Sequence, residues 1–162
     1  YISMPSGRNQ IIFDMDNVLL VSQLIDGKFP DYAPIIPKKY TTRTVLNTAE
    51  FSKACRTADI FARESSNTAR VAVEPGDGLS AASATIAANS KETGDNVAQV
   101  DANVEGMPVE IAFNVKFMSD ALGVIDTPQV ALETTSANEP GVLKPVGDND
   151  FVHIIMPMNF NR

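Results

Sequence analysis

Two aspartates one residue apart follow an apolar run near the start of the chain, and their spacing could support catalysis. Residues 11–13 are apolar, and Asp14 and Asp16 come directly after them on either side of Met15. A strand that ends in Asp-x-Asp can place a carboxylate nucleophile, a general acid and a magnesium ligand at one edge of a sheet. The chemistry that this arrangement could perform is that of a magnesium-dependent phosphatase.

The segment 144–150 adds to this interpretation, because Lys144 and the pair Gly147-Asp148 resemble the lysine and Gly-Asp motifs of haloacid-dehalogenase-type phosphatases. Lys144 lies only four residues before Asp148, however, which is too near for the two motifs to occupy separate loops. Those phosphatases also need parallel strands that alternate with helices, whereas this sequence indicates runs of strands and few helices. The phosphatase is therefore one alternative, and two polar hairpin turns explain the same residues.

The chain has one cysteine and one histidine, Cys55 and His153, so a zinc site built from these residue types would have too few ligands. Cys55 falls on the apolar side of a predicted helix, where a buried thiol is usually inert. His153 alternates with Val152 and Ile154, and we expect it on the wetter face of the last strand. The sequence predicts no catalytic residue, no metal site and no cofactor.

The predicted helix over residues 47–63 has a cationic side. At about 100° per residue, Lys53, Arg56 and Arg63 cluster opposite a broad apolar face. Such a cluster is either an ordinary solvated face or a contact for a polyanion. Ile60 falls on the cationic side, next to Phe61, and is either incidental or meets a partner. The apolar face consists of Phe51, Ala54, Cys55, Ala58 and Ala62.

The C-terminal segment ends in an apolar tail. Pro157 has no N–H group and should end strand pairing, which leaves Met156, Met158 and Phe160 around it. Flexible, polarisable methionines suit a groove that receives apolar peptide side chains, although packing in a core is their commoner use. The residues alone leave both interpretations open.

Composition places the chain among globular proteins. Its 162 residues include 20 acidic and 13 basic side chains, and 44% are hydrophobic, which excludes disordered and collagen-like classes. The longest apolar stretch, residues 18–21, is far shorter than the ~20 residues that cross a bilayer. The net charge of −7 argues against general attraction to nucleic acid but allows a local cationic face. A single cysteine and the lack of a signal-peptide pattern lead us to expect a cytoplasmic protein.

Prolines divide the chain near residue 38. Residues 11–25 predict a hairpin around Asp16-Asn17, and three prolines make 26–37 an extended connector. Strand-like sequence begins soon after Tyr1, so we expect residues 1–38 to be the end of an incomplete domain with its connector. Residues 39–162 are then expected to form a second domain.

This second part predicts the order strand, helix, three strands, twice in succession. Asn47 with Glu50 and, later, Asn114 are helix N-cap signals, and Gly123 ends the second helix. The pattern predicts an α+β fold: an internally duplicated strand-helix-three-strand unit, with antiparallel sheets and two helices on one face. Strands are expected at 41–46, 70–74, 78–89, 97–105, 109–113, 129–134, 141–146 and 151–156.

Three segments together resemble the bacterial beta sliding clamp, the processivity subunit of the replicative DNA polymerase. They are residues 23–32, the helix start Phe113-Asn114-Val115, and the ending 154–158. The family's chain has three similar domains and is more than twice as long. The resemblance implies that residues 1–38 close the second clamp domain and that 39–162 are the third.

The resemblance implies a function without catalysis. The full-length protein would be a head-to-tail homodimer that encircles duplex DNA without sequence preference. The replicative polymerase subunit, the clamp loader and repair polymerases would dock through short peptides, in the cytoplasm at the nucleoid, with no cofactor and no membrane. Besides the phosphatase, a β-rich interaction domain with no DNA role remains as an alternative.

The family's sites map onto several groups of residues. A DNA-facing role falls on Lys53, Arg56 and Arg63. Ala33-Pro34 stands where the family often has arginine, so a guanidinium contact to a peptide acid would be lost. The ring interface maps to Ile60, Phe61, Glu92 and Asp95, and the peptide pocket maps to Pro30, Pro34, Ile35, Asn114, Phe117, Ile154, Ile155, Met156, Pro157, Met158, Asn159 and Phe160.

Overall fold

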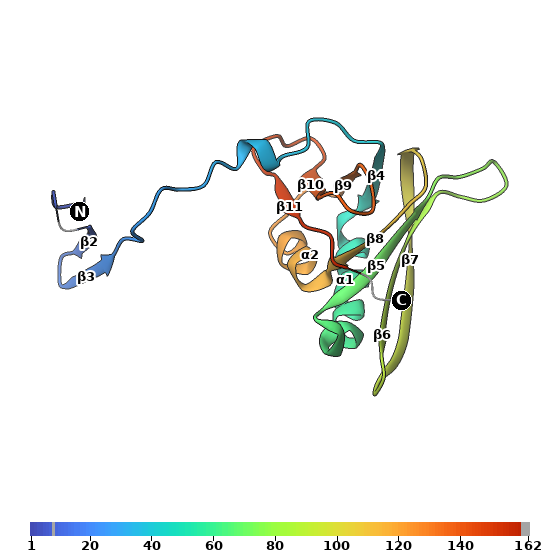
Figure 1. Ribbon diagram of the computed structural model, residues 1–162, viewed down its shortest axis with the longest axis horizontal. Coiled ribbons are helices and arrows are strands. Elements are labelled where there is room, and N and C mark those ends of the chain that lie inside the picture. Colours follow the sequence, from blue (N-terminus) through green and yellow to red (C-terminus); the bar gives the residue numbers. More distant parts are fainter. Residues whose placement is uncertain (8, 160–162) are drawn as a thin grey trace. The chain divides into compact units, whose positions relative to one another are not determined.

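The computed structural model describes residues 1–7 and 9–159, and the chain divides into two compact units, unit 1 (Tyr1–Pro34) and unit 2 (from Ile35 onward) (Figure 1). Unit 1 is a three-stranded antiparallel sheet in the order β1-β2-β3. The predicted hairpin is confirmed, because Met15 pairs with Val18 and Asp16 has a φ of 59° in the turn between them. The strands are β1 (Ile2–Ser3), β2 (Gln10–Met15) and β3 (Val18–Gln23).

The prolines had predicted an extended connector after this hairpin. The connector is not extended throughout. A short 3-10 helix, η1 (Ala33–Ile35), interrupts it. The Oδ1 atom of Asp31 accepts a hydrogen bond from the backbone N of Ala33 at 3.1 Å. An aspartate side chain therefore turns the backbone where the prolines alone favoured extension.

Unit 2 confirms the predicted order of strand, helix and three strands in two successive repeats. A short 3-10 helix, η2 (Arg63–Ser65), follows the first helix. The first repeat contains β4 (Thr42–Asn47), α1 (Thr48–Ala62), β5 (Thr68–Glu74), β6 (Ser83–Ser90) and β7 (Gly94–Gly106). The second contains β8 (Val109–Asn114), α2 (Val115–Leu122), β9 (Gln129–Thr134), β10 (Gly141–Pro145) and β11 (His153–Ile155).

The strands of unit 2 form one antiparallel sheet in the order β11-β10-β9-β4-β7-β6-β5-β8. The repeats pair in equivalent ways, since β4 lies beside β9 and β8 lies beside β5. The long strand β7 joins the two halves, because it pairs first with β6 and then with β4. The equivalent junction of the second repeat is a single bridge between Phe113 and Pro157, so the sheet nearly closes on itself.

Both helices begin at the predicted asparagine caps. The Oδ1 atom of Asn47 accepts from the N of Glu50 at 3.0 Å. That of Asn114 accepts from the N atoms of Lys116 (3.1 Å) and Phe117 (3.3 Å). The helices pack against each other and the sheet (Figure 1). No helix among the described residues is long and apolar enough to cross a membrane.

The predicted apolar face of α1 is buried in the core, and its small side chains let the helices and sheet approach closely. Phe51, Cys55, Ala58 and Ala62 are all 0% exposed. Burial raises the pKa of the Cys55 thiol to about 12, because the charged thiolate would lose its hydration. Cys55 is therefore a core residue, as the sequence predicted.

The prediction for His153 was wrong, because it lies on the packed face of β11. His153 pairs with Leu143, which is 0% exposed, and Ile155 on the same face is 3% exposed. The Nε2 atom of His153 is buried without a hydrogen-bond partner among the described residues. Lost hydration also lowers the pKa of this imidazole. Alternation with apolar neighbours could not reveal which face of the strand would pack against the core.

The strand predicted at 78–89 begins later, at Ser83. Its first residues belong instead to a loop held by Asp77, whose Oδ1 accepts from the N atoms of Leu79 (3.0 Å) and Ser80 (2.7 Å). These hydrogen bonds lower the pKa of the Asp77 carboxyl. The loop replaces strand pairing because the side chain satisfies the backbone donors locally.

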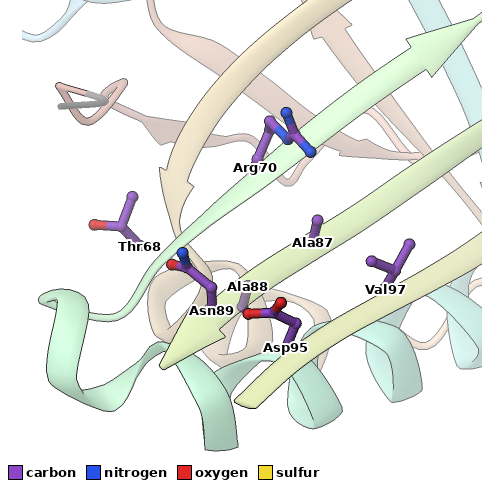
Figure 2. Close-up of a pocket in the computed structure, with 7 residues that line it drawn as sticks. All are labelled: Thr68, Arg70, Ala87, Ala88, Asn89, Asp95 and Val97. Carbon is purple, nitrogen blue, oxygen red and sulfur yellow. The ribbon is translucent and has the colours of Figure 1, made fainter. Parts of the chain in front are cut away.

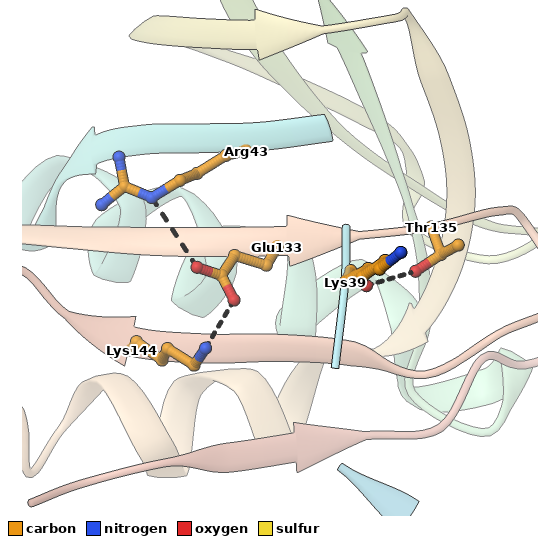
Figure 3. A network of polar contacts seen from close by, with 5 residues as sticks. All are labelled: Lys39, Arg43, Glu133, Thr135 and Lys144. Atoms are coloured by element: carbon orange, nitrogen blue, oxygen red, sulfur yellow. Dashed lines mark hydrogen bonds and ion pairs between the residues drawn. The ribbon is translucent and has the colours of Figure 1, made fainter. Parts of the chain in front are cut away.

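The fold does not support a phosphatase. Asp14 and Asp16 belong to an antiparallel hairpin rather than to the edge of a parallel sheet. The Nζ atom of Lys144 lies 2.6 Å from Oε2 of Glu133, whose Oε1 lies 3.7 Å from Nε of Arg43 (Figure 3). The ammonium group of Lys144 is thus neutralised by a largely shielded carboxylate. Beside this pair, Oγ1 of Thr135 donates to the backbone O of Lys39 at 3.2 Å.

Candidate functional site

The C-terminal tail meets the start of α2 at the seam between β8 and the end of the chain. Pro157 bridges to Phe113, and the N of Met158 donates to the O of Ala112 at 2.8 Å. Phe117, on α2, is 56% exposed, and Met156, directly after β11, is 60% exposed. Because α2 contacts β11, the structure places exposed apolar residues on α2 and on the neighbouring tail.

The other predicted pocket residues of unit 2 differ in how accessible they are. The side chain of Asn114 already caps α2 and also donates from Nδ2 to the O of Ser66 at 3.4 Å. Ile155 is 3% exposed and belongs to the core. Phe160 lies outside the described residues. Ile154, Pro157 and Met158 are half-buried, and Ile35 and Asn159 are exposed.

Pro30 and Pro34 are exposed residues of unit 1. They stand on the connector, and Pro34 lies within η1.

The cationic side of α1 is exposed, as predicted. Lys53, Arg56 and Arg63 are all exposed, and none of them forms an ion pair within the part of the chain that the structure describes. Ile60 is 54% exposed on the same side, whereas Phe61 is half-buried and packs against the core. The two apolar residues at this helix end therefore have different surroundings.

The turn between β6 and β7 is tied to the end of α1. The Oγ atom of Ser90 donates to Oε2 of Glu64 at 2.6 Å and accepts from the N atoms of Glu92 (3.2 Å) and Thr93 (3.0 Å). The hydrogen bond from Ser90 lowers the pKa of the Glu64 carboxyl. This places Glu92 and the helix end that carries Ile60 on neighbouring parts of one surface.

The N-terminal part of β7 has an open edge. Residues 94–101 pair with β6 on one side, and no described strand pairs with them on the other. The N of Ala102 donates to the O of Ala82 at 3.1 Å, so the alternation of an antiparallel ladder directs the even-numbered N–H groups toward β6. The N–H groups of Asp95, Val97 and Gln99 therefore point to the open edge.

Two hollows connect this edge to Ile60. A groove of about 380 Å³ lies between α1 and β7, and a second hollow of about 400 Å³ extends along α1 as far as Ile60. Lys53 and Thr57 line both, so they form one continuous surface. The groove is lined by Glu50, Lys53, Ala54, Thr57, Ala98, Gln99, Val100 and Asp101.

A third hollow, of about 320 Å³, lies beside the same edge over β5, β6 and β7 (Figure 2). Val97, which is 68% exposed, and Asp95 border it on β7. Arg70 borders it on β5, and its Nη1 atom lies 3.5 Å from Oε1 of Glu110. The open edge thus carries an exposed apolar residue, Val97, close to the charged Asp95.

Sequence reasoning missed this open edge. Its only signal was the length of β7, 13 residues against eight in β6, and that length has meaning only when the sheet order is known. Asp95 had been singled out by the family resemblance for its charge alone.

Comparisons with known proteins agree with one another. The family described as DNA polymerase III beta subunit, C-terminal domain, matches residues 33–159. The beta sliding clamp of Staphylococcus aureus (strain Mu50) is 36% identical over 93% of this chain and 39% of its own length. That of Bacillus subtilis (strain 168) is 34% identical over 92% of this chain and 39% of its own length.

Solved structures give the same result. The DNA polymerase sliding clamp from Bacillus subtilis superimposes with a TM-score of 0.83 at 31% identity, over 99% of this chain and 41% of its own. A sliding clamp from Pseudomonas aeruginosa has a TM-score of 0.83 at 27% identity, over 98% of this chain and 41% of its own. The chain therefore spans about two fifths of the length of the relatives that it matches.

Proposed function

Because this chain belongs to the DNA polymerase III beta subunit family, the beta sliding clamps, we propose that it is the C-terminal part of a ring that encircles duplex DNA. The protein would hold a replicative polymerase on DNA and would itself catalyse no reaction. The observation that carries this proposal is the match of the family over nearly all of unit 2, the unit in which two repeats set paired helices against one sheet.

The domain assignment follows from the same match. We propose that residues 1–38 are the end of the second clamp domain with its connector, and that residues 39–162 are the third domain. The division between Pro34 and Ile35 supports a boundary in this region.

Duplex DNA would face α1. The exposed side chains of Lys53, Arg56 and Arg63 are available for phosphate contacts, since no described acidic group neutralises them. Three cations can make only a few such contacts, which physiological salt weakens strongly. Retention on DNA would therefore come from the closed ring rather than from affinity.

The ring would close through the open edge of β7 and the surface around Ile60. An incoming strand could pair with the outward N–H groups of Asp95, Val97 and Gln99. Ile60 would supply apolar area at the end of this surface, and Glu92 and Asp95 would supply negative charge. The full-length protein would then be a head-to-tail homodimer.

Partner proteins would dock at the tail. Short peptides of the replicative polymerase subunit, the clamp loader and repair polymerases would bind the apolar surface formed by Phe117, Met156 and Met158. Ile35 would add to it from the start of unit 2. Partner binding and DNA retention would both take place in the cytoplasm, at the nucleoid.

Topology on DNA tests the proposal. The chain would replace the matching C-terminal part of the Bacillus subtilis beta sliding clamp, and the chimera would be loaded on nicked circular DNA. We expect retention in high salt that is lost when the circle is cut, because an encircling ring slides off an end. The 162-residue chain alone should be washed from both DNA forms. Salt-resistant retention of this chain on linear DNA would contradict the proposal.

A further inference from the structure

Gly141, the first residue of β10, leaves room for a side chain of another strand. A Cβ atom built on Gly141 would stand 2.6 Å from Cζ and 3.1 Å from Cε1 of Phe113, and 3.5 Å from Cγ2 of Ile155. Phe113 is 0% exposed and Ile155 is 3% exposed, so a packed interior surrounds the ring. The ring of Phe113 therefore occupies the space of the side chain that residue 141 lacks.

Phe113 is also the residue at which the C-terminal tail joins the sheet. Its backbone bridges to Pro157, and its neighbour Ala112 accepts the hydrogen bond from the N of Met158 at 2.8 Å. The equivalent junction of the first repeat, between β4 and β7, has five residue pairs. The seam at the tail is thus the shorter of the two, and a shift of β8 or β10 would separate its few contacts.

We propose that Gly141 is a positioning residue for the C-terminal tail. Its missing side chain lets the Phe113 ring lie between β8 and β10, and this holds the seam from which Met156 and Met158 present their side chains. The step from Gly141 to the tail is independent of the proposed function. The further step, from the tail to peptide affinity, rests on it.

Hydrogen exchange of the Met158 amide tests the first step. In Gly141→Ala, the added methyl group must displace the Phe113 ring, and we expect this amide to exchange roughly tenfold faster or more. Amides at the centre of the sheet, such as those of Val71 and Leu132, should change much less. Equal acceleration of all amides, or no change at Met158, would overturn the proposal.

A second substitution makes the test specific. Leucine lacks the outer part of the phenylalanine ring, so Phe113→Leu combined with Gly141→Ala should restore protection of the Met158 amide toward the wild-type rate. If Gly141→Ala alone does not fold, recovery of folding in the double variant supports the same conclusion. A double variant that is no better than Gly141→Ala refutes it.

Gly123→Ala is the matched control, because it adds the same methyl group at a residue with φ of −69° and no atom closer than 3.3 Å. It should leave exchange at Met158 unchanged. A labelled short peptide with leucine and phenylalanine side chains, which suit the proposed apolar surface, should bind the wild type weakly, the Gly141→Ala variant more weakly, and the double variant like the wild type. If the wild type binds no such peptide, the pocket proposal fails while the exchange data still decide the role of Gly141.

Discussion

Asn47 and Asn114 occupy equivalent places in the two repeats, but they are not equally free to act on a ligand. Each side-chain oxygen satisfies N–H groups in the first turn of its helix. Asn114 also donates from Nδ2 to the O of Ser66, and the N of Val115 donates to the O of Asn67. Asn114 thus couples the second helix to the first repeat, and we expect it to act on the peptide pocket mainly by fixing the start of α2.

His153 should make the free energy of unfolding depend on pH. Lost hydration lowers the pKa of this imidazole in the folded chain below its usual value of 6.5. As pH falls through 6.5, His153 takes up a proton more readily in the unfolded chain than in the folded chain. The free energy of unfolding should therefore decrease. At higher pH the imidazole is neutral in both states, and its effect on the free energy of unfolding no longer changes. Urea unfolding at several pH values between pH 7.5 and pH 5.5 would measure the decrease.

The control is His153→Gln, which has no group that titrates in this interval. His153 is the only histidine of the chain, so the variant should show a flatter dependence of unfolding free energy on pH. Equal slopes for the wild type and the variant would assign the pH dependence to carboxylates instead.

Local sequence signals explain which helices and strands could be predicted. Asparagine caps and strand alternation act within a few residues, and they located α1, α2 and β7 closely. The late start of β6 depends on hydrogen bonds to the Asp77 side chain, and the buried face of β11 depends on packing in the core. Alternation reports neither of them. The open edge of β7 depends on the order of all the strands and was therefore out of reach.

The open edge predicts an unusual tolerance to proline. In Val97→Pro the lost N–H points away from β6, so the ladder within unit 2 should persist and the stability of the isolated chain should change little. The same substitution in the full-length protein should weaken the dimer, because an incoming strand would lose that hydrogen bond. Urea unfolding and sedimentation equilibrium measure the two effects.

Ala98→Pro is the matched control for this prediction. The N–H of Ala98 points toward β6, so its loss should remove a ladder hydrogen bond and destabilise unit 2 by about 1 to 3 kcal/mol. If Val97→Pro is as destabilising as Ala98→Pro, or leaves the full-length dimer intact, the proposed pairing at this edge is incorrect.

At the scale of the whole molecule, candidate sites lie at places where the sheet of unit 2 is incomplete. The tail joins β8 at one bridge, and β7 has an unpaired edge over residues 94–101. Peptide docking is proposed at the first place and ring closure at the second. Through the family resemblance, the sequence alone could name residues near both of these places. It could not explain why the residues of each place lie together.

Under the proposed ring, this chain carries one side of the interface and lacks the first domain that would supply the other side. It should therefore be mainly monomeric, whereas the full-length protein should be a dimer. Ile60→Ala should weaken that dimer by roughly 2 to 5 kcal/mol if the interface buries the side chain fully. Sedimentation equilibrium of all three proteins gives these values.

Phe61 must be interpreted separately from Ile60 in this experiment. Phe61 packs against the core of its own unit, so Phe61→Ala should lower the stability of the isolated chain as well as the dimer affinity. Ile60 is 54% exposed, and Ile60→Ala should leave the isolated chain nearly as stable as the wild type. A tight dimer of the 162-residue chain, or a full-length dimer indifferent to Ile60→Ala, would mean that the subunits meet at another surface.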